Sequence, residues 1–174
     1  MQTARDGVGL YYVHVWHAPY RSILTAWCSL VLALGVGSGY AAMSTVPVED
    51  LAMEANTIVL GTVIQQASAW DARYTAIHTD VTLAVELVLI GPREEKVTLR
   101  VLGGRVGSMG MRTSIDAVFR NGERVIVCLD THTVPHTVVG MQQGKFEVKD
   151  NTVARASESW DLQAFIEAVR TAAR

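Results

Sequence analysis

The sequence predicts a mainly β fold of antiparallel strands with a short helix at each end. Apolar and polar residues alternate over residues 77–89, which is the period of a strand with one buried face. Turn-forming pairs separate the apolar runs, at Gly91-Pro92, Asn121-Gly122 and Asp150-Asn151. A chain of 174 residues has room for one domain of this kind.

The first 41 residues are expected to be a signal peptide or an N-terminal anchor. Arg21 precedes an uncharged apolar run over residues 23–39, and the small residues Gly39, Ala41 and Ala42 lie at its end. Secretory signal peptides have a positive residue, then a short apolar stretch, then a cleavage site with small residues. We expect cleavage after Ala41, one domain over residues 42–174, and export to the periplasm or the medium. Membrane contact is expected only through an uncleaved leader.

The domain is expected to begin with a helix over residues 47–55, because Pro47 suits the first helical turn and acidic residues follow it. A strand over residues 57–65 is apolar on both faces, which is typical of a central position. We expect a loop over residues 66–74.

The strand over residues 77–89 is longer than most strands, which indicates a bend or bulge. A turn at residues 91–95 joins it to a strand over residues 96–102, so the two form a hairpin. A glycine-rich loop at residues 103–114 and a connecting stretch at residues 115–119 follow.

The second half repeats the pattern of short strands and turns, and ends in a helix. Strands are expected over residues 124–129, 137–141, 145–149 and 152–155, with a loop at residues 132–136. In the helix, Ser159 is the expected N-cap. Its apolar stripe consists of Leu162, Phe165, Ile166, Val169 and Ala173.

Five to seven antiparallel strands with one long bent second strand favour a small OB-like, partly open barrel. A β-sandwich is the alternative. An OB fold usually has a helix between its third and fourth strands, where this chain has the glycine-rich loop.

Composition and motifs favour a binding or accessory module over an enzyme. The net charge of −2 does not indicate a nucleic-acid partner. Ser108 is not in a nucleophile elbow, because Val106 stands where glycine is needed. We expect no cofactor, and a protein or small ligand of the cell envelope as the partner.

The glycine-rich loop is the expected contact surface, since it holds four of the fourteen glycines within eight residues. Successive backbone N–H groups in such a loop can bind an anion, and arginines add charge. A close crossover of two backbones is the alternative. The candidate ligand-binding residues are Gly103, Gly104, Arg105, Gly107, Gly110 and Arg112, with Gln143 and Lys145 from the later turn.

Cys128, Asp130 and His132 share one face if their strand continues, and His136 follows. Zinc accepts such ligands, so a metal-dependent or cysteine hydrolase is the alternative function. A small buried cysteine beside surface histidines is the simpler interpretation, and we expect no metal. The third functional hypothesis is a structural envelope protein that is tethered by an uncleaved leader.

Several strings resemble a group of exported bacterial β-rich proteins with a GGxVGxxGM loop and a QGKF turn. They are GGRVGSMGMR at 103–112, FRNGERV at 119–125, VVGMQQGKF at 138–146, IVLGTV at 58–63 and TDVT at 79–82. The resemblance covers about residues 48–148. It implies export and a single β domain, and it implies no catalytic residues.

Overall fold

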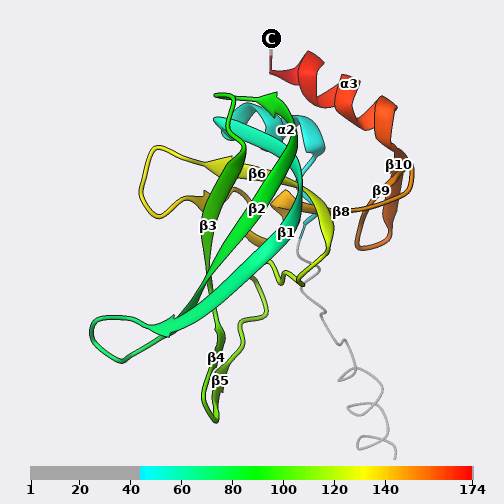
Figure 1. The fold of residues 1–174 in the computed structure, drawn as a ribbon. Helices are drawn as coiled ribbons and strands as arrows, with labels where there is room; N and C mark the ends of the chain where they lie inside the picture. The colour runs from blue at the N-terminus through cyan, green and yellow to red at the C-terminus, as the bar shows by residue number, and fades with distance from the viewer. Residues whose placement is uncertain (1–43, 174) are drawn as a thin grey trace, which may run out of the picture. The chain divides into compact units, whose positions relative to one another are not determined.

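The computed structural model describes residues 44–173, and the expected leader, residues 1–41, lies outside them. The described residues form a mainly β structure with two α-helices and one short 3-10 helix (Figure 1). The helices are α2 Val48–Glu54, η1 Met141–Gly144 and α3 Leu162–Ala172. The strands are β1 Thr57–Trp70, β2 Ile77–Ile90, β3 Lys96–Leu102, β4 Gly104–Val106, β5 Met109–Met111, β6 Arg124–Asp130, β7 Thr137–Val138, β8 Lys145–Lys149, β9 Thr152–Arg155 and β10 Glu158–Asp161.

One large antiparallel sheet organises the strands, in the order β10-β9-β8-β6-β1-β2-β3, with β7 paired to β6 beside this path. The strands β4 and β5 form a separate two-stranded sheet. The predicted mainly β class and the central position of β1 are therefore confirmed. None of the helices within residues 44–173 is long and apolar enough to cross a membrane.

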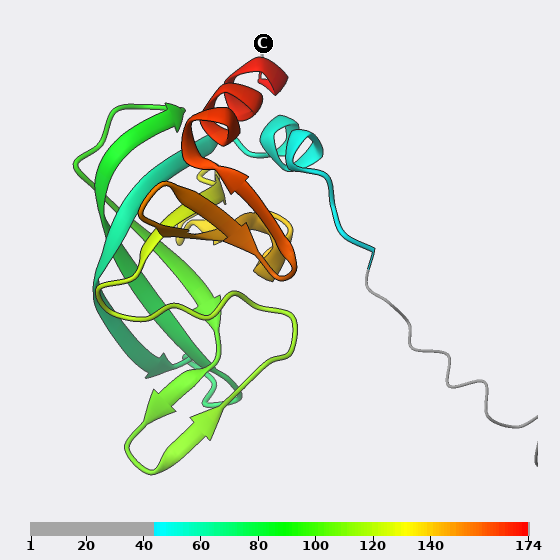
Figure 2. The ribbon, with the colours of Figure 1, turned by 90° about the vertical axis from the view of Figure 1, so that its right-hand side faces the viewer.

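Two hydrophobic cores share β1, because its side chains alternate between the two faces of the sheet. Ile58 and Leu60 face the core that contains α2 and α3. Val59 and Val63 face the second core, which contains β2, β3 and residues 117 and 119. Figure 2 shows the two helices together at one end of the curved sheet and the β4–β5 hairpin at the opposite end.

The strands β1 and β2 form a long hairpin. The bend predicted for the strand over residues 77–89 is confirmed, whereas the strand predicted over residues 57–65 is longer than expected. Three register shifts interrupt the pairing of β1 with β2, the last between Val63 and Gln65. The loop expected over residues 66–74 is wrong for residues 66–70, because β1 continues to Trp70 and pairs with Ile77 there, and it is right for residues 71–74. Polar residues in this part of β1 form hydrogen bonds with β2. The hydroxyl oxygens of Ser68 and Thr79, for example, lie 2.8 Å apart.

The strand expected over residues 137–141 is also corrected, because β7 ends at Val138. Gly140 and Met141 have φ of 67° and 57°, in the left-handed region that ends a strand. The chain turns there into η1 before β8 begins at Lys145.

The N-cap of α3 is Asp161, so the expected cap at Ser159 is wrong. The Asp161 Oδ1 atom accepts hydrogen bonds from the backbone N–H groups of Gln163 at 2.9 Å and Ala164 at 3.1 Å. Ser159 lies in β10 and pairs with Ala154 of β9. Because of this pairing, the N-cap stands two residues later than expected, at Asp161. The stripe of Leu162, Phe165, Ile166 and Val169 is buried as predicted, whereas Ala173 follows the helix and is exposed.

We expect Asp161→Ala to lower the free energy of unfolding by about 1 kcal/mol, because two N–H groups of the first turn lose their acceptor. Ser159→Ala is the matched control and should change it by less than about 0.5 kcal/mol. Urea unfolding of both variants measures the difference. A larger loss in Ser159→Ala than in Asp161→Ala would contradict the assignment of the cap.

Candidate functional site

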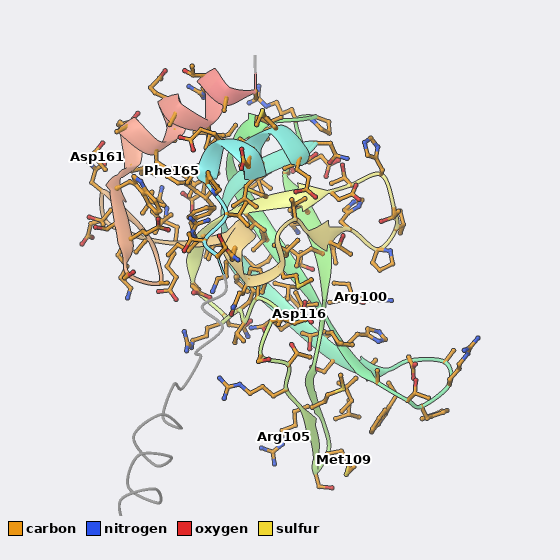
Figure 3. All side chains as sticks on the ribbon, turned by 180° about the vertical axis from the view of Figure 1, so that it is seen from behind. Arg100, Arg105, Met109, Asp116, Asp161 and Phe165 are labelled. Atoms are coloured by element: carbon orange, nitrogen blue, oxygen red, sulfur yellow. The ribbon has the colours of Figure 1, made fainter. Side chains whose placement is uncertain are left out.

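The glycine-rich segment is a small β-hairpin that leaves the end of β3. Gly104 pairs with Met111, Arg105 with Gly110, and Val106 with Met109. Gly107, at φ 59°, begins the turn between the two strands. In Figure 3, Arg105 and Met109 lie on the part of this hairpin that projects from the sheet.

The base of the hairpin crosses β1 and β2 so closely that only glycine fits there. Gly104 has a φ of 137°, and a Cβ atom on it would clash with the hydroxyl oxygens of Thr79 and Ser68. The Thr79 hydroxyl also donates a 2.7 Å hydrogen bond to the Gly103 carbonyl oxygen. At this position, glycine serves the close backbone crossover.

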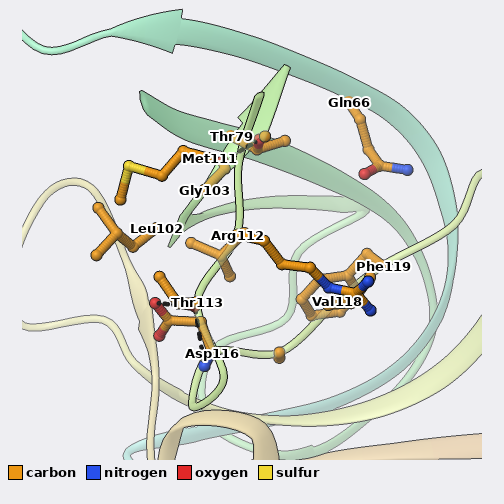
Figure 4. Close-up of a pocket in the computed structure, with 13 residues that line it drawn as sticks. Gln66, Thr79, Leu102, Gly103, Met111, Arg112, Thr113, Asp116, Val118 and Phe119 are labelled. Carbon is orange, nitrogen blue, oxygen red and sulfur yellow. Dashed lines mark hydrogen bonds between the residues drawn. The ribbon is translucent and has the colours of Figure 1, made fainter. Parts of the chain in front are cut away.

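A pocket of about 240 Å³ lies at this base, and we call it the Arg112 pocket (Figure 4). It is bounded by β1, β2, the end of β3, the hairpin and residues 113–119. Its apolar lining consists of Val101, Leu102, Met111, Ala117, Val118 and Phe119, and its polar lining includes Gln66, Thr79, Arg112, Thr113 and Asp116. Ala117 and Phe119 belong to the second core, so the floor of the pocket is continuous with the protein interior.

Arg112 is an exposed cation without a carboxylate partner among residues 44–173. The ion pairs in this part of the chain involve other arginines, such as Arg100 with Asp80 at 2.6 Å and Arg124 with Glu86 at 2.8 Å. Figure 4 shows the Arg112 side chain extended along the pocket toward Phe119. Its guanidinium therefore has donors available for an anionic ligand.

The structure brings together only part of the predicted contact surface. Gly103, Gly104 and Arg112 line the pocket, whereas Arg105, Gly107 and Gly110 lie on the projecting hairpin outside it. The Arg105 Nε atom donates a 3.2 Å hydrogen bond to the Gly107 carbonyl oxygen.

Gln143 and Lys145 make internal contacts. The Gln143 Oε1 atom accepts a 2.6 Å hydrogen bond from the backbone N–H of Val46. Lys145 Nζ lies 2.6 Å from Glu123 Oε1 in an ion pair whose two side chains are only 8% and 11% exposed. The same nitrogen donates to the Val118 carbonyl oxygen at 2.6 Å. Lys145 therefore binds the backbone of Val118, which lines the pocket.

Sequence reasoning missed Gln66, Asp116 and Val118 as pocket residues. They come from β1 and the connecting stretch, which are far apart in the chain and meet only in the folded sheet. No local sequence pattern identifies them, because the 50% exposure of Val118 between the buried Ala117 and Phe119 exists only in the folded protein.

The cysteine and histidine residues do not form a common site. Cys128 is 1% exposed in the core beneath the helices, and burial raises the pKa of its thiol to about 12. β6 ends at Asp130, so the shared face does not extend to His132, and His136 Nδ1 lies 3.0 Å from the Thr133 carbonyl oxygen. In residues 44–173, no three His, Cys, Asp or Glu side chains are placed to hold a metal ion. A protonated, buried thiol does not support a cysteine nucleophile.

No protein-family model matches the chain, and no curated protein matches it. The resemblance to exported bacterial β-rich proteins stays a prediction.

We expect Gly104→Ala to lower the free energy of unfolding by about 2 kcal/mol or more, because it places a methyl group against two hydroxyls at an unfavourable φ. Gly110→Ala is the control in the same hairpin, since the nearest atom to its added Cβ is at 3.9 Å. Chemical denaturation of both variants tests this. Equal stability of Gly104→Ala and Gly110→Ala would contradict the close crossover.

We expect the Cys128 thiol of the folded protein to react with iodoacetamide at pH 8.5 at least about a hundredfold more slowly than in urea, because it is buried and protonated. Labelling is read by the mass of the Cys128 peptide, since Cys28 is a second cysteine. Folding raises the pKa of the Cys128 thiol from 9.0 to about 12. The contribution of the protonated thiol to the free energy of unfolding is therefore fully present below pH 9, and it is lost as the pH rises toward 12. Cys128→Ala should remove that part of the pH dependence, and rapid labelling without denaturant would refute the assignment.

Proposed function

We propose that this protein is an exported binding module whose contact surface is the Arg112 pocket. The observation that carries the proposal is a guanidinium without a carboxylate partner, placed over a preformed apolar pocket. Small-molecule sites in proteins combine these two features, an apolar lining and a few polar groups that orient the ligand.

Binding rather than catalysis is favoured by the chemistry at the pocket. Of its ionisable side chains, Arg112 and Asp116, neither is a nucleophile held by a general base. Leu102 and Val118 at the rim are 46% and 50% exposed, so their apolar surface is available to a ligand. The burial of Cys128 also disfavours a cysteine nucleophile, on which one form of the alternative hydrolase depends.

We also propose that the curved sheet is an OB-like, partly open barrel, with a β-sandwich as the alternative. Support comes from an isolated parallel bridge between Leu99 of β3 and His136. The Arg100 N–H donates a 2.8 Å hydrogen bond to the His136 carbonyl oxygen, which brings β3 near β7. In this arrangement the pocket lies at one end of the barrel, where open barrels commonly bind ligands.

Export to the periplasm or the medium is proposed on the sequence alone. Arg21 and the apolar run after it are the support. Cys128 is the only cysteine in residues 42–174, so a domain of these residues can form no disulfide within itself.

The test is to incubate the protein, purified after expression of the full chain, with envelope extract and culture medium of the source cells. After re-isolation, bound proteins and small molecules are identified by mass spectrometry. We expect a molecule that wild type retains and Arg112→Ala loses, because the variant removes the cation of the pocket.

The matched control is Arg93→Ala, which removes an exposed arginine in the turn between β2 and β3, outside the Arg112 pocket. Thermal unfolding should give the same midpoint for both variants. Retention that Arg112→Ala does not change would count against the pocket as the contact surface.

A further inference from the structure

We infer that the Arg112 pocket binds a free apolar α-amino acid, with its carboxylate on Arg112, its ammonium group on Asp116 and its side chain on the apolar lining. This inference rests on the proposed function and names the ligand class of the same site.

The first support is the pair of opposite charges. Arg112 and Asp116 both line the pocket, yet they form no ion pair with each other, since no nitrogen of the Arg112 guanidinium lies within 4.0 Å of an Asp116 carboxylate oxygen. The Asp116 carboxylate accepts a 3.2 Å hydrogen bond from the Thr113 hydroxyl, which leaves its other oxygen available. Figure 4 shows Asp116 beside Thr113 and the guanidinium of Arg112 turned away from it, toward Phe119. One cation and one anion, held apart in one pocket, match a zwitterion.

The second support is the size of the pocket. Its volume of about 240 Å³ is below the roughly 300–1,000 Å³ of sites for drug-sized ligands. A pocket of this size suits one small molecule, such as a single amino acid, better than a larger ligand. The apolar lining, with Phe119 at the floor and Leu102 at the rim, favours an apolar side chain.

The charges also discriminate between ligands. A simple carboxylic acid leaves the Asp116 carboxylate without a counterion beside the ligand, and a simple amine leaves Arg112 unmatched. A peptide C-terminus offers a carboxylate but no ammonium group near it. Only a molecule with both charges satisfies both side chains.

The pocket walls are held in place before a ligand arrives. Thr113 and Asp116 are tied by two hydrogen bonds, one of which runs from the Asp116 N–H to the Thr113 hydroxyl oxygen at 3.3 Å. The carbonyl oxygen of Val118 is held by Lys145 Nζ. A preformed pocket binds with a smaller loss of conformational entropy.

The experiment titrates the isotopically labelled protein, purified after expression of the full chain, with L-leucine, L-methionine and L-phenylalanine. Binding is followed by NMR shifts of the backbone amides of residues 101–119. Two analogues of leucine each lack one charge: 4-methylpentanoate has no ammonium group, and L-leucinamide has no carboxylate. Glycine lacks the apolar side chain. We expect saturable binding of at least one of the three amino acids, and affinities about tenfold or more lower for its analogues and for glycine.

Two charge-removing variants assign the ends of the ligand. Arg112→Gln and Asp116→Asn should each weaken binding of the amino acid about tenfold. Arg112→Gln should leave the affinity for L-leucinamide unchanged, and Asp116→Asn should leave the affinity for 4-methylpentanoate unchanged or higher. Arg93→Gln is the control that should change none of these affinities, and equal thermal midpoints exclude unfolding.

The inference is overturned if none of the three amino acids shifts these amides saturably at millimolar concentration. It is equally overturned if 4-methylpentanoate binds as tightly as leucine, since the ligand is then a carboxylic acid, or if neither variant weakens binding. In each case, a molecule from the extract that depends on Arg112 would still support the proposed binding function, so the two failures are distinguishable.

Discussion

The alternation of side chains along β1 is the constraint on which the other features depend. β1 pairs with β6 over its first half and with β2 along nearly its whole length, so the backbone of its first half is paired on both sides. Because Ile58 and Leu60 face one core and Val59 and Val63 the other, a shift of one residue would exchange the contents of both cores. The register of β1 therefore determines where the helices pack and where the second core opens to the surface.

The pocket is a consequence of how the second core ends. Beyond Val63, β1 continues beside β2 and β3, and the chain that leaves β3 crosses β1 and β2 there. Gly104 permits the crossing because it has no Cβ atom to meet Ser68 and Thr79. Residues 113–119 then return over the core, and Ala117 and Phe119 fill it only in part, which leaves the Arg112 pocket above them.

Charged residues have different roles at different depths in this structure. Lys145 and Glu123 form a nearly buried pair, and removal of either partner would leave an unmatched charge inside the protein. Asp80 and Arg100 are more than a third exposed, so their ion pair contributes little to stability, although it lowers the pKa of the Asp80 carboxyl through its hydrogen bond. Arg112 differs from these because its charge is not used within the described fold, which is why we assign it to a ligand.

The local pattern of the sequence determined the strands β2, β3, β8 and β9, the buried face of α3 and the turns between them, because alternation, helical spacing and turn residues act over a few positions. The sequence also pointed to Gly103, Gly104 and Arg112. The tertiary structure alone decided the length of β1, the cap at Asp161 and the internal roles of Gln143 and Lys145, because each depends on a partner distant in the chain or on strand pairing. The meeting of Arg112 with Gln66, Asp116 and Val118 is of the same kind, since a pocket is formed by surfaces that only the fold brings together.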